Sequence, residues 1–439
     1  MIRLRALPLT ALQRKFEMVA VNSKRRIAIV GSGPAGCTLA CLLARAGMEA
    51  VIFDDEKRPE MVVGESLIPL LVTVFRRLGI EEKVAALGTY KPGVTWSLSD
   101  EEALLLSFDA IEGVLPTYAY NVPRREFDQL ITDTALEAGA KFVKVSAKLE
   151  LVDGAPELSA ETLALVPEWG GRQPDLLIDA SGRRRLFAKL LGIGADVGLR
   201  KDVSHFAHYE GCVMPPPSGQ TLISRLKHGW GWRIPLPGKV SVGVVINKEH
   251  AKKYGDTPEE QLERIIEESP VLISTCRDRV RISPVTTYAN YQLISHRGHG
   301  RNWTAVGDSF GFVDPMLSPG LCMAMVSAER LADVIIQGGD WESKAGEYID
   351  WFRNELVAWQ DLIDYFYDGR IFALFKSGMQ FSERYPGKFS MMMQKHMSRH
   401  IAGMAAGGLT TRAYSRGLLR FMSKYATRDC FKAEDYAVQ

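Results

Sequence analysis

Three glycines near the start of the chain have the spacing of a phosphate-binding turn, G-x-G-x-x-G. They follow the apolar run 27–30, and a second apolar run, 50–53, ends at Asp54. Glycine permits a tight turn whose backbone N–H groups approach a pyrophosphate, and the acid accepts hydrogen bonds from a ribose. The pattern predicts a dinucleotide-binding strand–helix–strand unit, with a ligand-free glycine turn as the alternative. The binding residues would be Gly31, Gly33, Pro34, Ala35, Gly36 and Asp54.

Two further acidic residues follow short apolar runs. Asp179 comes directly after residues 176–178, and Asp308 comes after residues 304–306 and Gly307. In an open α/β sheet, an acid that lies just past a strand end and before a turn is placed where ligands bind. Both positions therefore predict additional contacts to the same dinucleotide.

Together with Arg124 in the run NVPRREFD, these segments resemble the flavoprotein monooxygenase superfamily over residues 25–335. The resemblance implies that the cofactor is FAD, and that Arg124, Asp308 and Gly311 contact it near the flavin. No second G-x-G-x-x-G follows a strand, so the sequence shows no dedicated NAD(P)H domain. We therefore expect a separate flavin reductase to supply reduced FAD.

A lysine and a pair of tryptophans are the other residues that suggest chemistry. Lys91 lies in the run YKPGV, and Trp230 and Trp232 lie in the run HGWGWRIPLP. Burial lowers the pKa of a lysine and makes its neutral amine accessible, so a buried Lys91 would be reactive. Side chains at i and i+2 of a strand share a face, so the two indoles would form one wall. The alternatives are a surface lysine in a Lys-Pro turn and a strand that fills a core.

The same residues carry a closer resemblance. The run Gly64–Glu65–Ser66 before Pro69, the Lys-x-Gly at Lys91 and the pattern W-x-W-x-I-P look like the flavin-dependent halogenases, and the KPG run is similar to those that act on phenols. In that family, reduced flavin and dioxygen turn halide into hypohalous acid. The resemblance implies that Lys91 polarises this acid or is halogenated by it, and that the tryptophans suppress hydroxylation by separating substrate from flavin. It places Glu65 in the same region, with its role open.

Residues 314–320, DPMLSPG, align with the segment that holds the halide in these enzymes. Leu317 stands where the tryptophan-specific enzymes have a catalytic glutamate, an acid that the phenol and pyrrole enzymes also lack. The family binds halide through backbone N–H groups at this turn, and Pro319 has none. The residues expected to line the halide and substrate space are Glu65, Trp230, Trp232, Ser318, Pro319, Gly320 and Leu321.

The sequence thus predicts an FAD-dependent halogenase of secondary metabolism, a tryptophan-halogenase-like oxidoreductase of the phenol or pyrrole type. Its substrates would be halide and an electron-rich aromatic small molecule, a phenol by resemblance, either free or bound to a carrier protein. The main alternative is an FAD-dependent monooxygenase or dehydrogenase on the same scaffold, in which Lys91 would serve as an anchor. A flavin-binding module without catalysis is a third class.

These motifs require an α/β fold in which a Rossmann-like FAD-binding domain of the glutathione reductase type adjoins an antiparallel substrate sheet. Residues 38–46 are expected to form the helix after the glycines, and alternating runs such as KVSVGVVIN predict the antiparallel strands. Aromatic residues at helical spacing after residue 341 predict a helical region with its rings in the core. The expected divisions are 25–90, 120–200 and 290–340 for the FAD-binding domain, 91–119 and 201–289 for the sheet domain, 341–439 for the helical C-terminal extension and 1–24 for a leader.

Bulk composition excludes several other classes. The formal net charge is +2 over 439 residues, so nucleic acid is not an expected partner. The six cysteines have neither paired nor metal-like spacing, which fits free thiols in a reducing cytoplasm, and no metal site is expected. No apolar run reaches the length of a transmembrane segment. Residues 376–439 carry 11 Lys/Arg and 4 Asp/Glu, which indicates a solvated basic face or, alternatively, a docking surface for an acidic partner.

Overall fold

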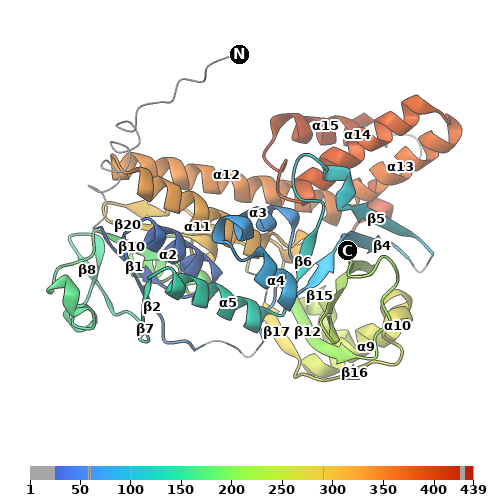
Figure 1. The fold of residues 1–439 in the computed structure, drawn as a ribbon. Coiled ribbons are helices and arrows are strands. Elements are labelled where there is room, and N and C mark those ends of the chain that lie inside the picture. The colour runs from blue at the N-terminus through green and yellow to red at the C-terminus, as the bar shows by residue number, and fades with distance from the viewer. Residues whose placement is uncertain are drawn as a thin grey trace, which may run out of the picture.

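The computed structural model describes residues 25–57, 59, 61–99, 101–289, 291–425 and 431–438. The predicted leader at 1–24 and Cys430 lie outside these residues. Two large sheets form the centre of the molecule, and long helices from the C-terminal third of the chain run across them (Figure 1). The predicted α/β class is therefore confirmed.

The first sheet has six strands in the order β19-β20-β10-β1-β2-β7, all parallel except β19 against β20. Its central strands are buried on both faces, as expected for a parallel sheet covered by helices. The strands are β1 (Arg26–Val30), β2 (Glu49–Phe53), β7 (Lys141–Val143), β10 (Leu176–Asp179), β19 (His299–Gly300) and β20 (Trp303–Ala305).

The helix after the glycines, α2, spans Pro34–Arg45 and so begins four residues before the predicted start at residue 38. Pro34 explains the difference. Proline suits the first position of a helix because its φ is already helical and its missing N–H would have no intrahelical partner there. The early start brings the N-terminus of α2 directly to the glycine turn.

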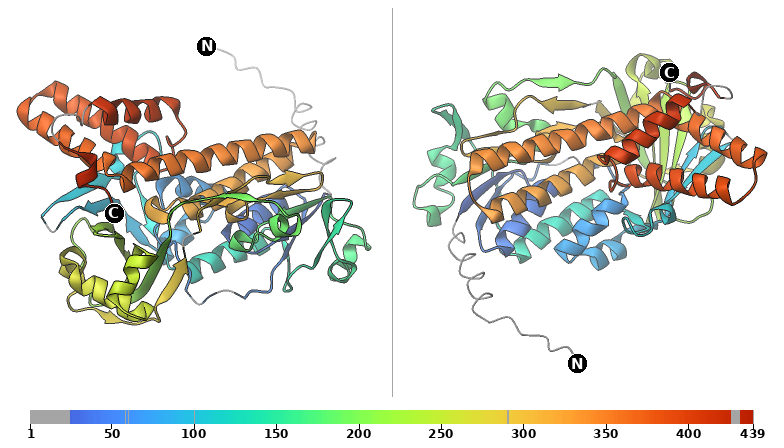
Figure 2. Two further views of the ribbon diagram at one scale, coloured as in Figure 1. Left: turned by 180° about the vertical axis from the view of Figure 1, so that it is seen from behind. Right: turned by 90° about the horizontal axis from the view of Figure 1, so that it is seen from above.

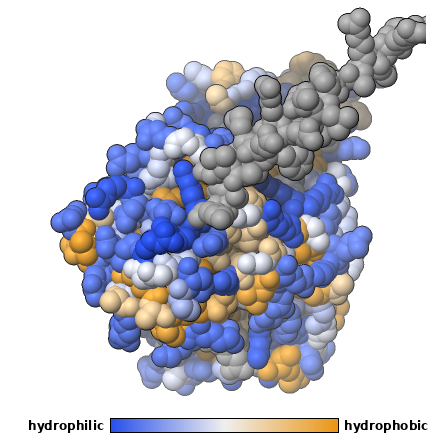
Figure 3. Space-filling view, turned by 60° about the vertical axis from the view of Figure 1, so that its left-hand side comes forward, coloured by the Kyte–Doolittle hydropathy of each residue, from blue (hydrophilic) through white to orange (hydrophobic). Residues whose placement is uncertain are grey.

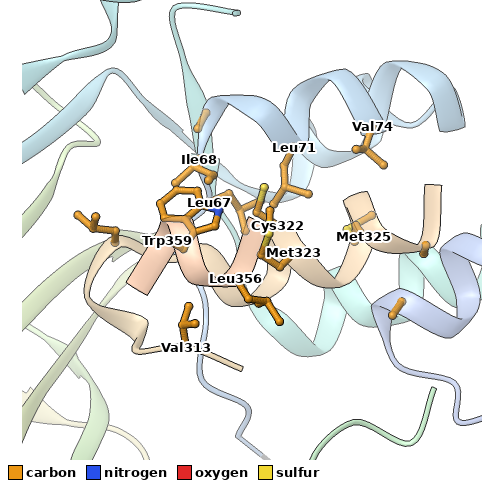
Figure 4. Packing of buried hydrophobic residues seen from close by; sticks show 14 of the residues in the cluster. Leu67, Ile68, Leu71, Val74, Val313, Cys322, Met323, Met325, Leu356 and Trp359 are labelled. Atoms are coloured by element: carbon orange, nitrogen blue, oxygen red, sulfur yellow. The ribbon is translucent and has the colours of Figure 1, made fainter. Parts of the chain in front are cut away.

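Five more helices cover the parallel sheet or connect it to the rest of the chain. Figure 4 shows how α3, α11 and α12 pack, with Leu71 on α3, Met323 on α11 and Trp359 on α12 in one buried cluster. α5 and α11 both lie against α2. These helices are α3 (Pro69–Leu78), α5 (Arg124–Glu137), α11 (Pro319–Gln337) and α12 (Trp341–Tyr367), and α4 (Glu81–Leu87) follows α3.

The second sheet has eight strands in the order β16-β12-β15-β14-β13-β4-β5, with β17 paired to β12. All neighbours are antiparallel except β13 and β4. One face joins the main core, and α9 and α10 cover the other. The elements are β4 (Gly93–Ser97), β5 (Ala103–Ser107), β12 (Asp202–Glu210), β13 (Thr221–Leu226), β14 (Gly229–Leu236), β15 (Lys239–Asn247), β16 (Val280–Arg281), β17 (Thr286–Ala289), α9 (Pro258–Glu268) and α10 (Pro270–Cys276).

Smaller elements complete the fold. Three helices form a lobe at the far end of α12 (Figure 2). Of the aromatic rings predicted to pack in the core, Phe352, Trp359, Phe366 and Phe372 are buried, whereas Trp351 is only partly buried against it. The elements are β3 (Thr89–Lys91) paired with β6 (Ala119–Asn121), β8 (Leu149–Val152) with β9 (Ala155–Leu158), β11 (Ala195–Val197) with β18 (Leu293–Ser295) and β21 (Gly311–Phe312), α6 (Ala160–Leu163), α7 (Leu186–Leu190), α8 (Lys248–Ala251), α13 (Arg370–Arg384), α14 (Lys388–Ala405) and α15 (Ala413–Tyr425).

Hydrophilic side chains cover much of the face shown in Figure 3, with hydrophobic groups scattered between them. Within the described ranges, no helix is long and apolar enough to cross a membrane. The five cysteines that these ranges contain are free thiols, and no group of three His, Cys, Asp or Glu side chains there is arranged to hold a metal ion.

Candidate active site

A cavity of about 470 Å³ lies between the two sheets. One side is formed by the turns that follow β1, β10 and β20, at the carboxyl ends of the parallel strands, where open α/β sheets bind ligands. The other side is formed by β12, β13 and β14. The cavity therefore has a nucleotide-binding type of edge opposite an antiparallel wall.

The glycine turn is built so that one of its glycines is left open to the cavity. Gly31 has φ +114°, and a Cβ there would overlap the carbonyl oxygen of Ala180. A Cβ on Gly36 would overlap the carbonyl oxygen of Gly31. By contrast, Gly33 has nothing within 4 Å of an added Cβ and, with Pro34 and Ala35, lines the cavity. Two glycines are thus needed for backbone packing, and Gly33 leaves room for a ligand at the N-terminus of α2.

Asp54 lies beside this turn at the end of β2. Its carboxylate accepts hydrogen bonds from the backbone N–H of Ser32, at 2.7 Å, and of Glu56, at 2.7 Å. It does not line the cavity itself. The acid is therefore fixed against the glycine turn, which is the placement expected of a ribose acceptor.

We expect Gly33→Val to weaken FAD binding about tenfold or more while the protein stays folded, because the side chain would enter only the open part of the cavity. The φ of Gly33, −67°, is one that any residue adopts. Gly36→Val is the matched comparison, and it should lose both FAD binding and stability. A fluorescence titration with FAD and a thermal melt measure the two properties. Wild-type FAD affinity in Gly33→Val would contradict the assignment of this turn.

The flavin-side residues predicted from the sequence are divided between the cavity and its surroundings. Arg124, at the start of α5, forms a two-point ion pair with Asp128, at 3.0 and 3.1 Å, and both line the cavity. Asp308 also lines it, and burial raises the pKa of this carboxyl to about 6, opposed by the nearby Arg124 and Arg183. Gly311 lies on β21 and is not on the wall. Gly33 leaves space in the cavity, the N-terminus of α2 points to it, and the two arginines Arg124 and Arg183 line it. Together these features fit a dinucleotide with an anionic centre.

Lys91 is one of the most completely buried charged side chains of the protein, with 1% of its surface exposed. Its Nζ donates to Ser66 Oγ and to the carbonyl oxygen of Leu67, both at 2.7 Å, and lies 5.6 Å from the centre of the Phe108 ring. Burial lowers the pKa of Lys91 to about 7. The alternative of a surface lysine in a turn is therefore wrong.

Lys91 does not itself line the cavity, but Ser66 and Thr221 do, and their hydroxyl oxygens are 2.9 Å apart. The lysine is therefore connected to the cavity through the Ser66 hydroxyl. Thr221 donates its hydroxyl hydrogen to Asn121 Oδ1 at 3.1 Å, so the Ser66 hydroxyl, which accepts from Lys91, donates to Thr221.

The tryptophan pair forms a continuous wall. Trp230, Trp232 and Ile234 alternate along β14 and face the cavity, whereas Arg233 between them points to α10 on the reverse face. The two indole rings lie 5.6 Å apart. Gly243 on β15 pairs with Trp232, and a Cβ there would overlap that indole, so this glycine lets the ring lie across the sheet.

Both indoles are held by hydrogen bonds. Trp230 Nε1 donates to Tyr367 Oη at 2.9 Å, and Trp232 Nε1 donates to Ser241 Oγ at 3.3 Å. Tyr367, the last residue of α12, in turn donates to Asp314 Oδ2 at 2.8 Å. The C-terminal helix therefore fixes the orientation of the wall.

The segment aligned with the halide turn is the entry to α11. Ser318 has φ +57°, and Pro319 is the first residue of the helix, so its missing N–H removes nothing that the helix needs. Ser318, Gly320 and Leu321 line the cavity, and Pro319 does not. The N–H groups of Gly320 and Leu321 belong to the first helical turn, where they have no intrahelical partner and attract anions. The proline therefore removes none of the N–H groups that this helix start presents to the cavity.

Several residues that line the cavity or hydrogen-bond to its wall were not predicted from the sequence. Asp314 accepts from Tyr367, Gln292 and the N–H of Met316, and its burial raises its pKa to about 6. Asp314 stands before a proline at the start of DPMLSPG, and this position is the sequence feature that could have identified it. No sequence signal marks Tyr367, which lies 53 residues further along the chain. The other residues in this group are Ser66, Asp128, Arg200, Asp202, His208 and Thr221.

Known proteins share both the sequence and the fold. The profile of the tryptophan halogenase family matches residues 26–112 and 109–375. The tryptophan 2-halogenase of Chondromyces crocatus is 29% identical over 406 residues, which cover 88% of this chain and 76% of that protein. The 1H-pyrrole-2-carbonyl-peptidyl-carrier-protein brominase of Pseudoalteromonas luteoviolacea is 30% identical over 359 residues, covering 79% and 86%. The structure of the flavin-dependent brominase Bmp2 has a TM-score of 0.72 at 25% identity and covers 91% of this chain and 99% of its own.

The profile match extends over most of the chain, so the resemblance carried by the glycine, lysine and tryptophan motifs is confirmed at the level of the family. The open cradle at Gly33 fits the FAD that such flavoproteins use. The chain belongs to the tryptophan halogenase family and is an FAD-dependent oxidoreductase of the flavin-dependent halogenase type.

Proposed function

We propose that this enzyme halogenates an electron-rich aromatic substrate, a phenol, with halide, dioxygen and reduced FAD from a separate flavin reductase. The observation that carries the proposal is the buried amine of Lys91, hydrogen-bonded to a hydroxyl on the wall of a cavity whose opposite wall is the indole pair. With dioxygen, bound reduced FAD supplies the oxidising power that converts halide to hypohalous acid. The protein has to hold the halide, direct the hypohalous acid and position the ring.

The halide would bind at the start of α11. Ser318, Gly320 and Leu321 face the cavity there, and the positive end of a 19-residue helix favours an anion. FAD would lie between Gly33 and Asp308, with Arg124 opposite its negative charge. These two sites share one cavity, which lets the oxidant form next to the substrate wall.

Lys91 would direct the hypohalous acid. Its ammonium polarises the Ser66 hydroxyl, which would turn from Thr221 to donate to the oxygen of the acid and make the halogen more electrophilic. An apolar wall of Ile223, Trp230, Trp232 and Ile234 would hold the flat ring and exclude water. The overall change is replacement of a ring hydrogen by halogen, with the oxygen of the hypohalous acid leaving as water.

The choice of a phenol rests on the KPG run at Lys91 and on the hydroxyl groups of Ser66 and Thr221, which can hydrogen-bond a phenolic oxygen. Relatives differ in this respect, since one is named for tryptophan and another for a pyrrole carried on a protein. We propose that the phenol is used free, with a carrier-bound form as the variant to compare. The basic residues after 376 would then face an acidic carrier.

The test is an assay of the purified protein with a flavin reductase, NADH, FAD, dioxygen, resorcinol and either bromide or chloride. We expect mass-spectrometric detection of halogenated resorcinol that requires the halide. Oxygenated product formed without halide, and no halogenated product with either ion, would instead establish the monooxygenase alternative. A resorcinol-type acid on a carrier protein, assayed beside the free acid, measures the substrate form.

A further inference from the structure

A buried acid–histidine pair on the wall of the cavity has no role in the function proposed so far. Glu65 lines the cavity with 3% of its surface exposed. Its Oε1 lies 2.6 Å from Nε2 of His208, which reaches it from β12. In the part of the chain that the structure describes, this is the single hydrogen bond to the Glu65 carboxylate. One carboxylate oxygen is therefore anchored, and the other is left for a molecule in the cavity.

The pair lies next to the group that directs the oxidant. Glu65 and Ser66 are consecutive residues, and they cross one end of the eight-stranded sheet. Glu65 contacts His208 on β12, while Ser66 contacts Thr221 on β13 and Lys91 on β3. The segment is fixed on both sides by backbone bonds, from Val122 N–H to Glu65 and from Leu67 N–H to Tyr120. Both side chains line the cavity, the carboxylate on the side of β12 and the lysine-linked hydroxyl on the side of β13, so a ring bound between them would face both groups.

The other carboxylates on the cavity wall are already engaged. Asp128 is ion-paired with an arginine, Asp202 accepts from Arg200 at 2.7 Å, and Asp314 accepts three hydrogen bonds. Asp308 belongs to the flavin-side motif. Glu65 differs from them because, among the described residues, one histidine nitrogen is the single partner of its carboxylate, which leaves the second carboxylate oxygen to face the cavity.

We propose that Glu65, positioned by His208, is the base that removes the ring proton during halogenation. This inference rests on the proposed function. As the ring carbon bonds to the halogen, the halogen–oxygen bond of the hypohalous acid breaks and its electron pair goes to oxygen. The C–H bond at that carbon then breaks, its electrons restore the aromatic ring, and the proton passes to the Glu65 carboxylate. Glu65 then passes this proton to the hydroxide left from the hypohalous acid, so that water and the halogenated ring are the products, and Glu65 supplies the carboxylate that Leu317 cannot.

Adjacency is what makes this assignment specific. The halogen and the departing proton are on the same ring carbon, so the group that delivers one and the group that accepts the other must lie close together. Glu65 and Ser66 are joined by one peptide bond and both line the cavity, so one ring can lie within reach of both groups, whereas Asp202 and Asp314 contact other elements of the wall. Removal of the proton then competes directly with reversal of the halogen addition.

The test compares Glu65→Gln with the wild type, using equal amounts of resorcinol and ring-deuterated resorcinol. Glutamine keeps the shape and the contact with His208 but cannot accept a proton. We expect halogenation to fall about 100-fold with FAD affinity unchanged, and the product to become enriched in molecules from the protiated ring, because C–H cleavage now limits the rate. Wild type should show no such enrichment, and Glu65→Asp should restore part of the rate.

Glu81→Gln is the matched control, since Glu81 is an acid paired with Arg76 and Tyr118 outside the cavity, and it should behave as wild type. An active Glu65→Gln protein with the wild-type rate and isotope distribution overturns the proposal. If Glu65→Gln does not fold, His208→Gln serves instead, and a wild-type isotope distribution in it has the same consequence. A wild type that forms no halogenated resorcinol refutes the proposed function, and this inference with it.

Discussion

Lys91→Met should reduce halogenation roughly 100-fold or more while FAD still binds, because the cavity loses the only ammonium that reaches it through Ser66 among the described residues. Methionine matches the length of the lysine stem and fills the same buried space. Product is measured by mass spectrometry at saturating FAD. Lys83→Met, at a surface lysine paired with Glu137, is the control and should keep full activity. Full halogenation by Lys91→Met would remove the lysine from the mechanism.

The same substitution has an expected signature in stability. In the folded protein the pKa of Lys91 is about 7, against 10.5 in the unfolded chain. Below pH 7 both states carry the proton, and the folded state bears a desolvation cost of roughly 5 kcal/mol. Between pH 7 and 10.5 the folded protein has released a proton that the unfolded chain still binds, so wild-type stability rises with pH. The stability of Lys91→Met relative to wild type should therefore be highest below pH 7 and should fall toward pH 10.

Urea unfolding at pH 6, 8 and 9.5 measures this difference. The loss of the hydrogen bonds to Ser66 and Leu67 lowers the stability of the variant by a similar amount at every pH, so the trend is unaffected by it. A difference that stays constant with pH would mean that Lys91 is charged in the folded protein across the whole range. That result would also remove the neutral amine as a candidate site of halogenation.

Features carried by short stretches of sequence were predicted correctly. The glycine turn and the indole pair depend on residues a few positions apart, and their geometry follows from the periods of a turn and a strand. The position of the turn at Ser318 was also predicted from the sequence. The effect of Pro319 was not, because the expected loss of a backbone N–H donor has no consequence when α11 begins at that proline.

Contacts between side chains that are far apart in the sequence could not be predicted from it. Ser66 meets Lys91 and Thr221 only because the segment before α3 crosses the antiparallel sheet. Tyr367 reaches Trp230 because α12 is long enough to end beside β14. Neither contact produces a periodic pattern in the sequences of the two segments that it joins. Lys91, predicted to act on the hypohalous acid, accordingly lies one hydrogen bond behind the cavity wall.

Trp232→Ala is expected to change the product as well as the stability. Loss of a buried indole costs about 3–5 kcal/mol, from lost burial and from the cavity left behind. Trp230 alone cannot close the space, because its ring is tied to Tyr367 and cannot swing across. If the indole pair separates substrate from flavin, the ring can then approach the flavin, and hydroxylated resorcinol should appear beside halogenated resorcinol.

The ratio of the two products, rather than the total, tests the wall. Trp169→Ala is the matched control, because Trp169 is as deeply buried but lies in the core against β1 and β2, away from the cavity. It should cost similar stability and leave the product ratio unchanged. Trp232→Phe should also leave the ratio unchanged, since it keeps a ring across Gly243 and loses only the bond to Ser241. An unchanged ratio in Trp232→Ala would mean that the pair serves as packing, and that exclusion of hydroxylation depends on another part of the cavity.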